Sequence, residues 1–455
     1  MEMVLEFLRD VLSQPALLIG IMSCVGLVAL KRPFHKVMTG TLKPILGYLM
    51  LAVGAGVIVS NLDPLGKMIE HGFHITGVVP NNEAIVAVAQ KVLGVETMSI
   101  LVVGLLMNLC IARFTKFKYV FLTGHHSLFM ACLMSAVLGT AGLSGIELIL
   151  VGGFLMGAWS AISPAIGQSY TSKVTDGDEI ALGHFGSLGY YLSAWVAKYV
   201  GKADDSTEDI EIPEKWGFLR DSTLSTALTM IVFYLIAALA AGSEFVATLS
   251  GSMSPYLFAV MSAMNFAVGV AIVYSGVRMI LGDLIPAFQG IATKIIPNAI
   301  PAVDCAVFFT YAPTAVVLGF ISSFIGGIIG MLILGAVGGV LIIPGLVPHF
   351  FCGATAGIYG NATGGRRGAA VGAFLNGLAI TFLPALALPV LGQLGFQNTT
   401  FGDADFAVMG LVLGNAYEWV GMAGIYGIVA IAALVLIIPN FIKTKGKVIN
   451  YVEEE

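Results

Sequence analysis

The sequence predicts an all-α polytopic membrane protein, and its composition, its apolar runs and its few buried polar residues indicate this class. Of the 455 residues, 57% are hydrophobic and 11% are charged, and the mean hydropathy is +0.92. Soluble domains carry about 25% charged residues, because charge covers a water-exposed surface. A lipid-exposed surface has no such need, so the shortage of charge favours a chain embedded in a bilayer.

About twenty apolar residues are enough for a helix to cross a bilayer. Runs of this kind lie near 14–30, 42–60, 97–113, 119–140, 145–166, 223–242, 255–276, 304–323, 327–347, 368–390 and 407–440. The last run is long enough for one strongly tilted span or for a broken pair. These runs predict ten to twelve crossings.

Three further segments are apolar but interrupted by Gly, Pro and polar residues, and they cover 177–201, 277–303 and 348–367. Non-helical backbone at membrane depth is tolerated only where protein shields it or where it lines a wet cavity. Broken helices of this kind often mark the substrate site of a transporter. We therefore expect these segments to be re-entrant or broken, and to lie near the functional site.

Basic residues predict the orientation of the chain. They cluster after the first run, after the third, in a short loop and after the last run: Lys31, Arg32, Lys36; Arg113, Lys116, Lys118; Arg366, Arg367; Lys443, Lys445, Lys447. Under the positive-inside rule these loops face the cytoplasm. The N-terminus then lies outside and the C-terminus inside, which requires an odd number of crossings, and eleven fits. Because the first basic cluster follows the first run, we interpret that run as an uncleaved helix.

Two further patterns concern the organisation of the chain. Residues 43–52 (KPILGYLMLA) are echoed by 278–287 (RMILGDLIPA), which suggests an internal duplication of the kind found in transporters. The polar and mostly acidic segment 201–222 would lie on the cytoplasmic side. It is either a solvated loop or part of a docking face for a cytoplasmic partner.

Ionisable residues inside a span cost about 2.5–3.5 kcal/mol each at a helix centre, so their default interpretation is functional. His125 and His126 lie in TGHHS within the fourth run, and His184 lies in LGHFGS within an interrupted segment. Asp304 opens the eighth run. For His125 and His126 the structural alternative is a hydrogen bond between helices. For His184 it is an aromatic hairpin at the membrane interface, and for Asp304 it is a helix N-cap.

Three other acidic residues carry weaker signals. Glu147 lies near the end of its span and is interpreted as interfacial, and Asp283 fits a structural or a functional role equally well. Glu418 lies deep enough to require a partner.

Several functional classes are not supported by the sequence. It holds no nucleotide-binding G-K-[ST] loop, no G-x-S-x-G and no H-E-x-x-H. The net charge of −5 gives no basic surface for nucleic acid. The five cysteines lie in apolar runs, and the histidines have no recognisable metal-ligand spacing. We expect inert thiols, no cofactor and no metal.

Four separated polar motifs carry a family resemblance: FLTGHHSLF, VTDGDEIALGHFGS, IPAVDCAVFFTYAPTAVVLGF and LIIPGLVPHFFCGATAGIYGNATGGRRGA. They resemble the ascorbate-type enzyme IIC, the membrane permease of the bacterial phosphoenolpyruvate-dependent phosphotransferase system. The resemblance extends from the first span past residue 420.

The resemblance implies a fold of eleven spans plus re-entrant hairpins. Residues 1–65 and 223–300 would form a duplicated V-motif domain that makes a homodimer. Residues 66–222 and 301–440 would form the substrate-carrying core, with hairpins near 177–201 and 348–367, and 441–455 would be a cytoplasmic tail. It also implies residence in the bacterial inner membrane, in contact with lipid.

The resemblance further implies a reaction. The permease would bind L-ascorbate outside and carry it inward by an elevator-like movement of the core. A phosphocysteine on a separate enzyme IIB, itself supplied by enzyme IIA, would then donate phosphate. Because a reactive cysteine needs an exposed, electropositive setting, we expect no fused IIB domain and no phosphoryl-accepting residue in this chain.

The resemblance also implies substrate-contacting residues, which are His125, His126, Ser127, Leu128, Phe129, His184, Phe185, Asp304, Asn82 and Glu83. The match is poor around Asn82 and Glu83. Some relatives carry amides where this chain has Phe129 and Phe185, which leaves the exact substrate open. The alternative function is a secondary transporter of a small organic anion or sugar acid, driven by protons or sodium, with His125 and Asp304 as the coupling relay.

Overall fold

The computed structural model describes residues 30–73, 77–178, 180–209, 222–269, 299–392 and 399–441, with isolated residues within 16–28 and 271–279 and at 296. About half of the first predicted span and most of the interrupted segment 277–303, including Asp283, lie outside the described residues.

Helices make up most of the described chain, and six short strands join them. The α-helices are α3 (Phe34–Phe73), α4 (Asn82–Phe114), α5 (Gly124–Thr140), α6 (Gly145–Thr175), α7 (Ser187–Val200), α8 (Ser222–Ala241), α9 (Ser243–Ser250), α11 (Pro313–Ala336), α12 (Leu346–Gly392), α13 (Ala404–Val420) and α14 (Met422–Ile437). The 3₁₀ turns are η1 (Thr207–Asp209), η3 (Cys305–Thr310) and η4 (Ile438–Phe441). The strands are β1 (Gly77–Pro80), β2 (Tyr119–Phe121), β3 (Ala181–Leu182), β4 (Ile300–Val303), β5 (Leu341–Ile342) and β6 (Thr399–Thr400).

Among the described residues, six helices are long and apolar enough to cross a membrane, or seven if the bent pair α8–α9 forms one span. They are Phe34–Gly54, Leu93–Phe114, Gly145–Thr175, Thr314–Ala336, Val347–Leu391 and Met422–Phe441. This number fits a multi-pass membrane protein. The predicted count of eleven is not confirmed.

Two of the predicted spans are corrected by the structure. The runs 304–323 and 327–347 are not two helices, because the single helix α11 crosses the boundary between them. The chain on either side of α11 forms the 3₁₀ turn η3 and the strand β5. Apolar composition cannot show where helix gives way to strand or turn, because a fully buried strand and a buried helix have similar compositions. The last run, 407–440, is a broken pair, α13 and α14, divided at Gly421.

The predicted hairpin near 348–367 is part of the longer element α12, which turns back on itself at Gly365. As a straight helix, the 45 residues of Val347–Leu391 would be about 67 Å long, roughly twice the hydrocarbon thickness. Gly365 has non-helical angles (φ 61°, ψ −152°). A Cβ at Gly360 would lie only 2.4 Å from the carbonyl oxygen of Gly368, whereas these residues would be about 12 Å apart in a straight helix. The two arms of α12 therefore pack against each other.

The start of the acidic segment 201–222 is attached to these helices. The Arg366 backbone N–H donates to the Asp205 carbonyl oxygen over 2.7 Å, and its guanidinium Nε donates to the Ser206 carbonyl oxygen over 2.9 Å. The Glu208 carboxylate accepts the N–H groups of Thr314 and Ala315 at the start of α11. Residues 202–209 are thus fixed to α11 and to the turn of α12, and residues 210–221 lie outside the described chain.

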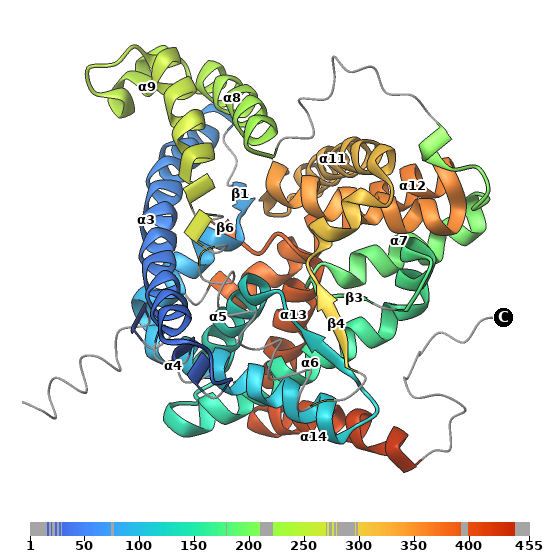
Figure 1. Ribbon diagram of the computed structural model, residues 1–455. Helices are drawn as coiled ribbons and strands as arrows, with labels where there is room; N and C mark the ends of the chain where they lie inside the picture. Colours follow the sequence, from blue (N-terminus) through green and yellow to red (C-terminus); the bar gives the residue numbers. More distant parts are fainter. Residues whose placement is uncertain are drawn as a thin grey trace, which may run out of the picture.

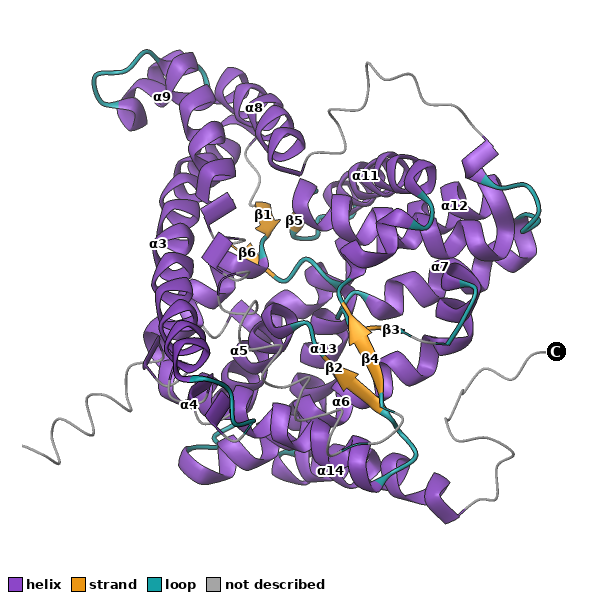
Figure 2. Cartoon of the chain, viewed as in Figure 1, coloured by secondary structure: helices purple, strands orange, loops and turns teal. Residues whose placement is uncertain are grey.

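Two small parallel sheets lie among the helices (Figure 2). In one sheet β1 lies between β5 and β6, and in the other β4 lies between β2 and β3. Each sheet therefore takes its central strand from one half of the chain and its two edge strands from the other half. The strands satisfy one another's backbone groups, which non-helical backbone requires wherever water is absent.

The helices divide around these sheets (Figure 1). Helices α3, α8 and α9 lie together on one side, where the Tyr234 hydroxyl of α8 donates to the Asn61 carbonyl oxygen of α3. The remaining helices surround the sheets, and α5 is buried from His126 to Leu138. A helix that is apolar on every face requires such surroundings. The domain boundaries given above remain a prediction, and α3 runs past the expected boundary at residue 65.

Replacing Gly365 by Ala tests the turn of α12. A Cβ there would lie 2.2 Å from the Lys202 carbonyl oxygen and 2.3 Å from that of Asp205, and the backbone angles cost a non-glycine residue about 1–3 kcal/mol. We expect Gly365→Ala to lower the thermal unfolding midpoint of the purified protein in detergent by several degrees. Gly427→Ala in α14, where a Cβ meets open space, serves as the control. Equal midpoints for the two variants would contradict the assigned turn.

Candidate functional site

The ends of the strands position the candidate residues. His125 follows β2, His184 follows β3, and Asp304 follows β4 directly. The three strands are parallel neighbours in one sheet, so their carboxyl ends meet at one edge, where open parallel sheets commonly bind ligands. At this edge the Gly183 backbone N–H donates to the Val303 carbonyl oxygen over 2.7 Å. A Cβ at Gly183 would lie 2.3 Å from the Ala302 carbonyl oxygen, so no larger residue fits before His184.

His125 and Asp304 form the accessible edge of the site. Their side chains are 17% and 29% exposed, and His125 Nε2 lies 3.1 Å from Asp304 Oδ2. A ring N–H on Nε2 donates to the carboxylate in this geometry. The other ring nitrogen, Nδ1, is buried and has no hydrogen-bond partner among the described residues. A neutral His125 therefore offers an acceptor to a ligand hydroxyl.

His126 and His184 lie next to this edge, are buried, and have ring planes inclined at 47° to each other. Their ring centroids are 3.6 Å apart. The Phe185 backbone N–H donates to His126 Nδ1 over 3.2 Å, and the Gly186 backbone N–H donates to His184 Nδ1 over 3.1 Å. A backbone N–H can only donate, so both Nδ1 atoms act as acceptors, and the proton of each neutral ring resides on Nε2.

The Tyr190 hydroxyl lies 2.8 Å from His184 Nδ1, and because a hydroxyl can donate or accept, it is compatible with this tautomer. The buried pair thus presents two ring N–H groups as donors. Two donors on adjacent rings suit an anionic oxygen, because hydrogen bonds with an ionised partner are the stronger ones.

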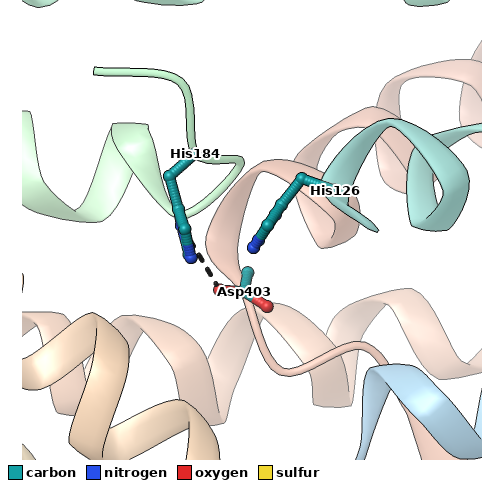
Figure 3. Close-up of side chains that lie close together, drawn as sticks. All are labelled: His126, His184 and Asp403. Atoms are coloured by element: carbon teal, nitrogen blue, oxygen red, sulfur yellow. Dashed lines mark ion pairs between the residues drawn. The ribbon is translucent and has the colours of Figure 1, made fainter. Parts of the chain in front are cut away.

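The two buried histidines also approach Asp403 (Figure 3). One ligand atom from each of His126, His184 and Asp403 lies within 4.8 Å of the others, and His184, Asp304 and Cys305 form a second such group. Metal binding needs a free ring lone pair. Because Nδ1 of both His126 and His184 already accepts a backbone N–H and Nε2 carries the proton, the arrangement fits an anion better than a cation.

Three phenylalanine rings, those of Phe129, Phe185 and Phe406, contact the histidines. Phe185 stacks on Phe121 at a centroid distance of 4.5 Å. Phe129 meets the rings of His125 and His126 edge-on or tilted at 5.8 and 5.7 Å, and Phe406 of α13 stacks on His126 at 5.6 Å. These rings form an apolar wall beside the polar atoms.

The remaining predicted residues differ in their roles. Ser127 is buried, and its hydroxyl donates to the Thr123 carbonyl oxygen over 3.4 Å, while Leu128 belongs to the apolar core. Asn82, at the start of α4, is engaged on both sides: its amide donates to Asp403 Oδ2, and its oxygen accepts the Gly402 N–H over 2.8 Å. The side chain of Glu83 lies outside the described part of the chain.

The structure adds two acidic residues that the sequence interpretation missed, Asp403 and Asp405. Both are buried. Asp403 Oδ1 accepts the Cys352 thiol over 2.8 Å and lies 3.8 Å from His184 Nδ1. They occur in the short stretch FGDAD between two apolar runs, where polar residues are normally assigned to a loop. Two acidic residues directly before an apolar run were the available signal.

The chain resembles known proteins over most of its length. The chain is 27% identical over 417 residues to the "Ascorbate-specific PTS system EIIC component" of Mycoplasma pneumoniae. The alignment covers 78% of this chain and 62% of that relative. The model of the family described as "PTS system sugar-specific permease component" matches residues 10–405. That match covers most of the sequence, including all the candidate site residues from Asn82 to Asp405, and so the chain belongs to the family of sugar-specific permease components of the phosphotransferase system.

Proposed function

We propose that this protein imports L-ascorbate, and the observation that carries the proposal is the polarity of the three histidines. His126 and His184 present ring N–H donors, while His125 presents a buried acceptor. Ascorbate is a small monoanion with neighbouring hydroxyl groups on a planar ring. Its enolate oxygen would accept from the buried pair, and a hydroxyl would donate to His125 Nδ1.

Asp304 and the aromatic wall would complete recognition of the ligand. Asp304 is fixed by His125 at the accessible edge and can accept from a further hydroxyl. Phe129 and Phe185 contact the His126 ring at centroid distances of 5.7 and 6.0 Å and would give the ligand an apolar surface. Buried donors and acceptors that match a ligand's own groups discriminate strongly against analogues without them. The name of the Mycoplasma pneumoniae relative supports ascorbate as the substrate.

The transport step would be an elevator-like movement of the core, 66–222 and 301–440, against a dimeric V-motif domain, 1–65 and 223–300. The grouping of α3, α8 and α9 on one side of the molecule supports this division (Figure 1). The interlocked sheets support an internal duplication, since each half contributes one central strand and two edge strands. Ascorbate released inside would receive phosphate from a phosphocysteine of enzyme IIB, charged by enzyme IIA.

The cysteines of the described chain support a separate phosphoryl carrier. Cys132, Cys305 and Cys352 are buried. Cys24 is half-buried in the first apolar run, and Cys110 is exposed but belongs to a candidate membrane span. An exposed thiol inside a membrane span would face lipid, so none of these five thiols is expected to have the exposed, electropositive setting of a reactive cysteine.

Transport in vesicles tests the coupling. With the cytoplasmic phosphotransfer proteins and phosphoenolpyruvate inside, we expect labelled ascorbate to accumulate as its phosphate; without them we expect equilibration only. Accumulation of unmodified ascorbate without those proteins, abolished by an uncoupler, would favour the alternative of an ion-driven transporter. In that alternative the His125–Asp304 pair would carry the coupling proton.

Substitutions of His184 test the binding geometry. His184→Gln places an amide N–H near the Nε2 position, whereas His184→Asn and His184→Ala do not. Loss of a hydrogen bond to a charged group costs about 1.5–3 kcal/mol, or roughly 10–100-fold in affinity. We expect that loss for Asn and Ala, and a smaller loss for Gln, in calorimetric titration with ascorbate. His35→Ala, at an exposed position of α3, is the control. Unchanged binding by His184→Ala would show that the site is elsewhere.

The proposed orientation places the N-terminus outside and the C-terminus in the cytoplasm. A fluorescent protein that matures only in the cytoplasm should therefore fluoresce when fused after residue 455. A single cysteine added at the N-terminus, in a background with Cys110 replaced by Ser, should react with an impermeant maleimide on intact cells. A dark fusion with a shielded N-terminal cysteine would reverse the assignment.

A further inference from the structure

Asp405 is a buried carboxylate with contacts to two helices besides its own. It is the second residue of α13 and is fully buried. Its Oδ2 accepts the Ser187 hydroxyl over 2.7 Å and the Trp159 indole N–H over 3.1 Å. Its Oδ1 accepts the Leu188 backbone N–H over 2.9 Å. The carboxylate thus joins α6 and α7 to the start of α13.

The same residue also holds the backbone just before α7. The Asp405 backbone N–H donates to the Phe185 carbonyl oxygen over 3.0 Å. The carboxylate therefore fixes Ser187 and Leu188 while the backbone N–H fixes Phe185, so residues 185–188 are attached at both ends. The carboxylate lies at the N-termini of α7 and α13 at once, where two helix dipoles favour negative charge.

This short segment carries the two peptide N–H groups that orient the buried histidines. The N–H of Phe185 donates to His126 Nδ1, and the N–H of Gly186 donates to His184 Nδ1. A shift of residues 185–188 by about 1 Å away from the two rings would lengthen both bonds beyond ordinary hydrogen-bond distance. Each ring would then be free to carry its proton on either nitrogen.

We propose that Asp405 is a positioning residue which, through the backbone of residues 185–188, keeps the protons of His126 and His184 on Nε2, so that both rings act as donors to an anionic substrate. Asp405 itself need not touch the substrate. The assignment of the rings as anion donors rests on the proposed function, whereas the effect of Asp405 on the ring protons does not.

The arrangement requires a carboxylate at position 405, because all three groups that contact this side chain are hydrogen-bond donors. An amide at the same position has one acceptor oxygen and one NH₂ group, and that NH₂ group would face either the Leu188 N–H or the pair of Ser187 and Trp159. Two donors facing each other in a buried site cost about 1–3 kcal/mol. Asp405→Asn therefore displaces the segment with hardly any change in volume.

The test is nitrogen NMR of full-length protein carrying ¹⁵N-labelled histidine, in detergent and without ligand. The resonances of His126 and His184 are assigned by loss of signal in His126→Gln and His184→Gln. In the wild type we expect both rings to show a protonated Nε2 and an unprotonated Nδ1. In Asp405→Asn we expect a mixture of the two tautomers on at least one ring, and at least tenfold weaker binding of ascorbate.

Asp63→Asn is the matched control, because Asp63 is exposed and pairs only with Lys67 among the described contacts. It should leave both the tautomers and the affinity unchanged. Should Asp405→Asn fail to fold, Ser187→Ala and Trp159→Phe each remove one donor to the carboxylate and should produce a smaller shift in the same direction. A folded Asp405→Asn with wild-type tautomers, or two donor variants with wild-type tautomers, would overturn the proposal.

The two readouts separate the proposals. If the wild-type protein does not bind ascorbate but the tautomers still depend on Asp405, the substrate assignment fails and the positioning role stands. If ascorbate binds with equal affinity to wild type and Asp405→Asn, and the tautomers are unchanged, the positioning role fails and the substrate assignment stands.

Discussion

The need to satisfy backbone hydrogen bonds away from water governs this structure. A helix meets that need within itself, but a site built from several segments requires chain ends and turns at membrane depth. Here six short strands, two to four residues long, meet the need by pairing into two parallel sheets. Polar side chains follow the carboxyl ends of the strands in each sheet, and the helices that come next in the chain bury the residues around them. The histidines, Asp304, Asn82 and Asp403 all occupy positions just after such strands.

The two sheets meet at the site from different parts of the chain. His125, His184 and Asp304 follow the strands of one sheet, and Asn82 and Asp403 follow the strands of the other. The 3.8 Å approach of His184 to Asp403 is the point where the two sets come together (Figure 3). The two sets differ in the hydrogen-bonding groups that they leave available. The first set offers ring N–H groups and one unpartnered ring nitrogen, whereas the side chains of the second set already form hydrogen bonds with other groups of the protein. The first set is therefore suited to ligand binding and the second to support.

Much of the site could be predicted from the sequence, because a charged or ionisable residue in an apolar run stands out. His125, His126, His184 and Asp304 were found in this way, and the structure brings them together. Asp403 and Asp405 were missed because they lie between runs, where charge is unremarkable. Ring tautomers cannot be read from a sequence at all, since they depend on which backbone N–H faces which nitrogen. The division of 304–347 into one helix and two short flanking elements was equally hidden, because its composition is apolar throughout.

The interlocking of the sheets also bears on how the protein is made. The strand β1 pairs with Leu341 and Thr399, which leave the ribosome long after Gly77. At synthesis rates of roughly 5–20 residues per second, the first helices wait in the bilayer for tens of seconds before the missing edge strands exist. During that interval the backbone of β1 needs other hydrogen-bond partners, such as lipid headgroups, water or the insertion machinery. The candidate site is therefore among the last parts of the molecule to form, and errors in the final third of the chain leave the earlier strands without partners.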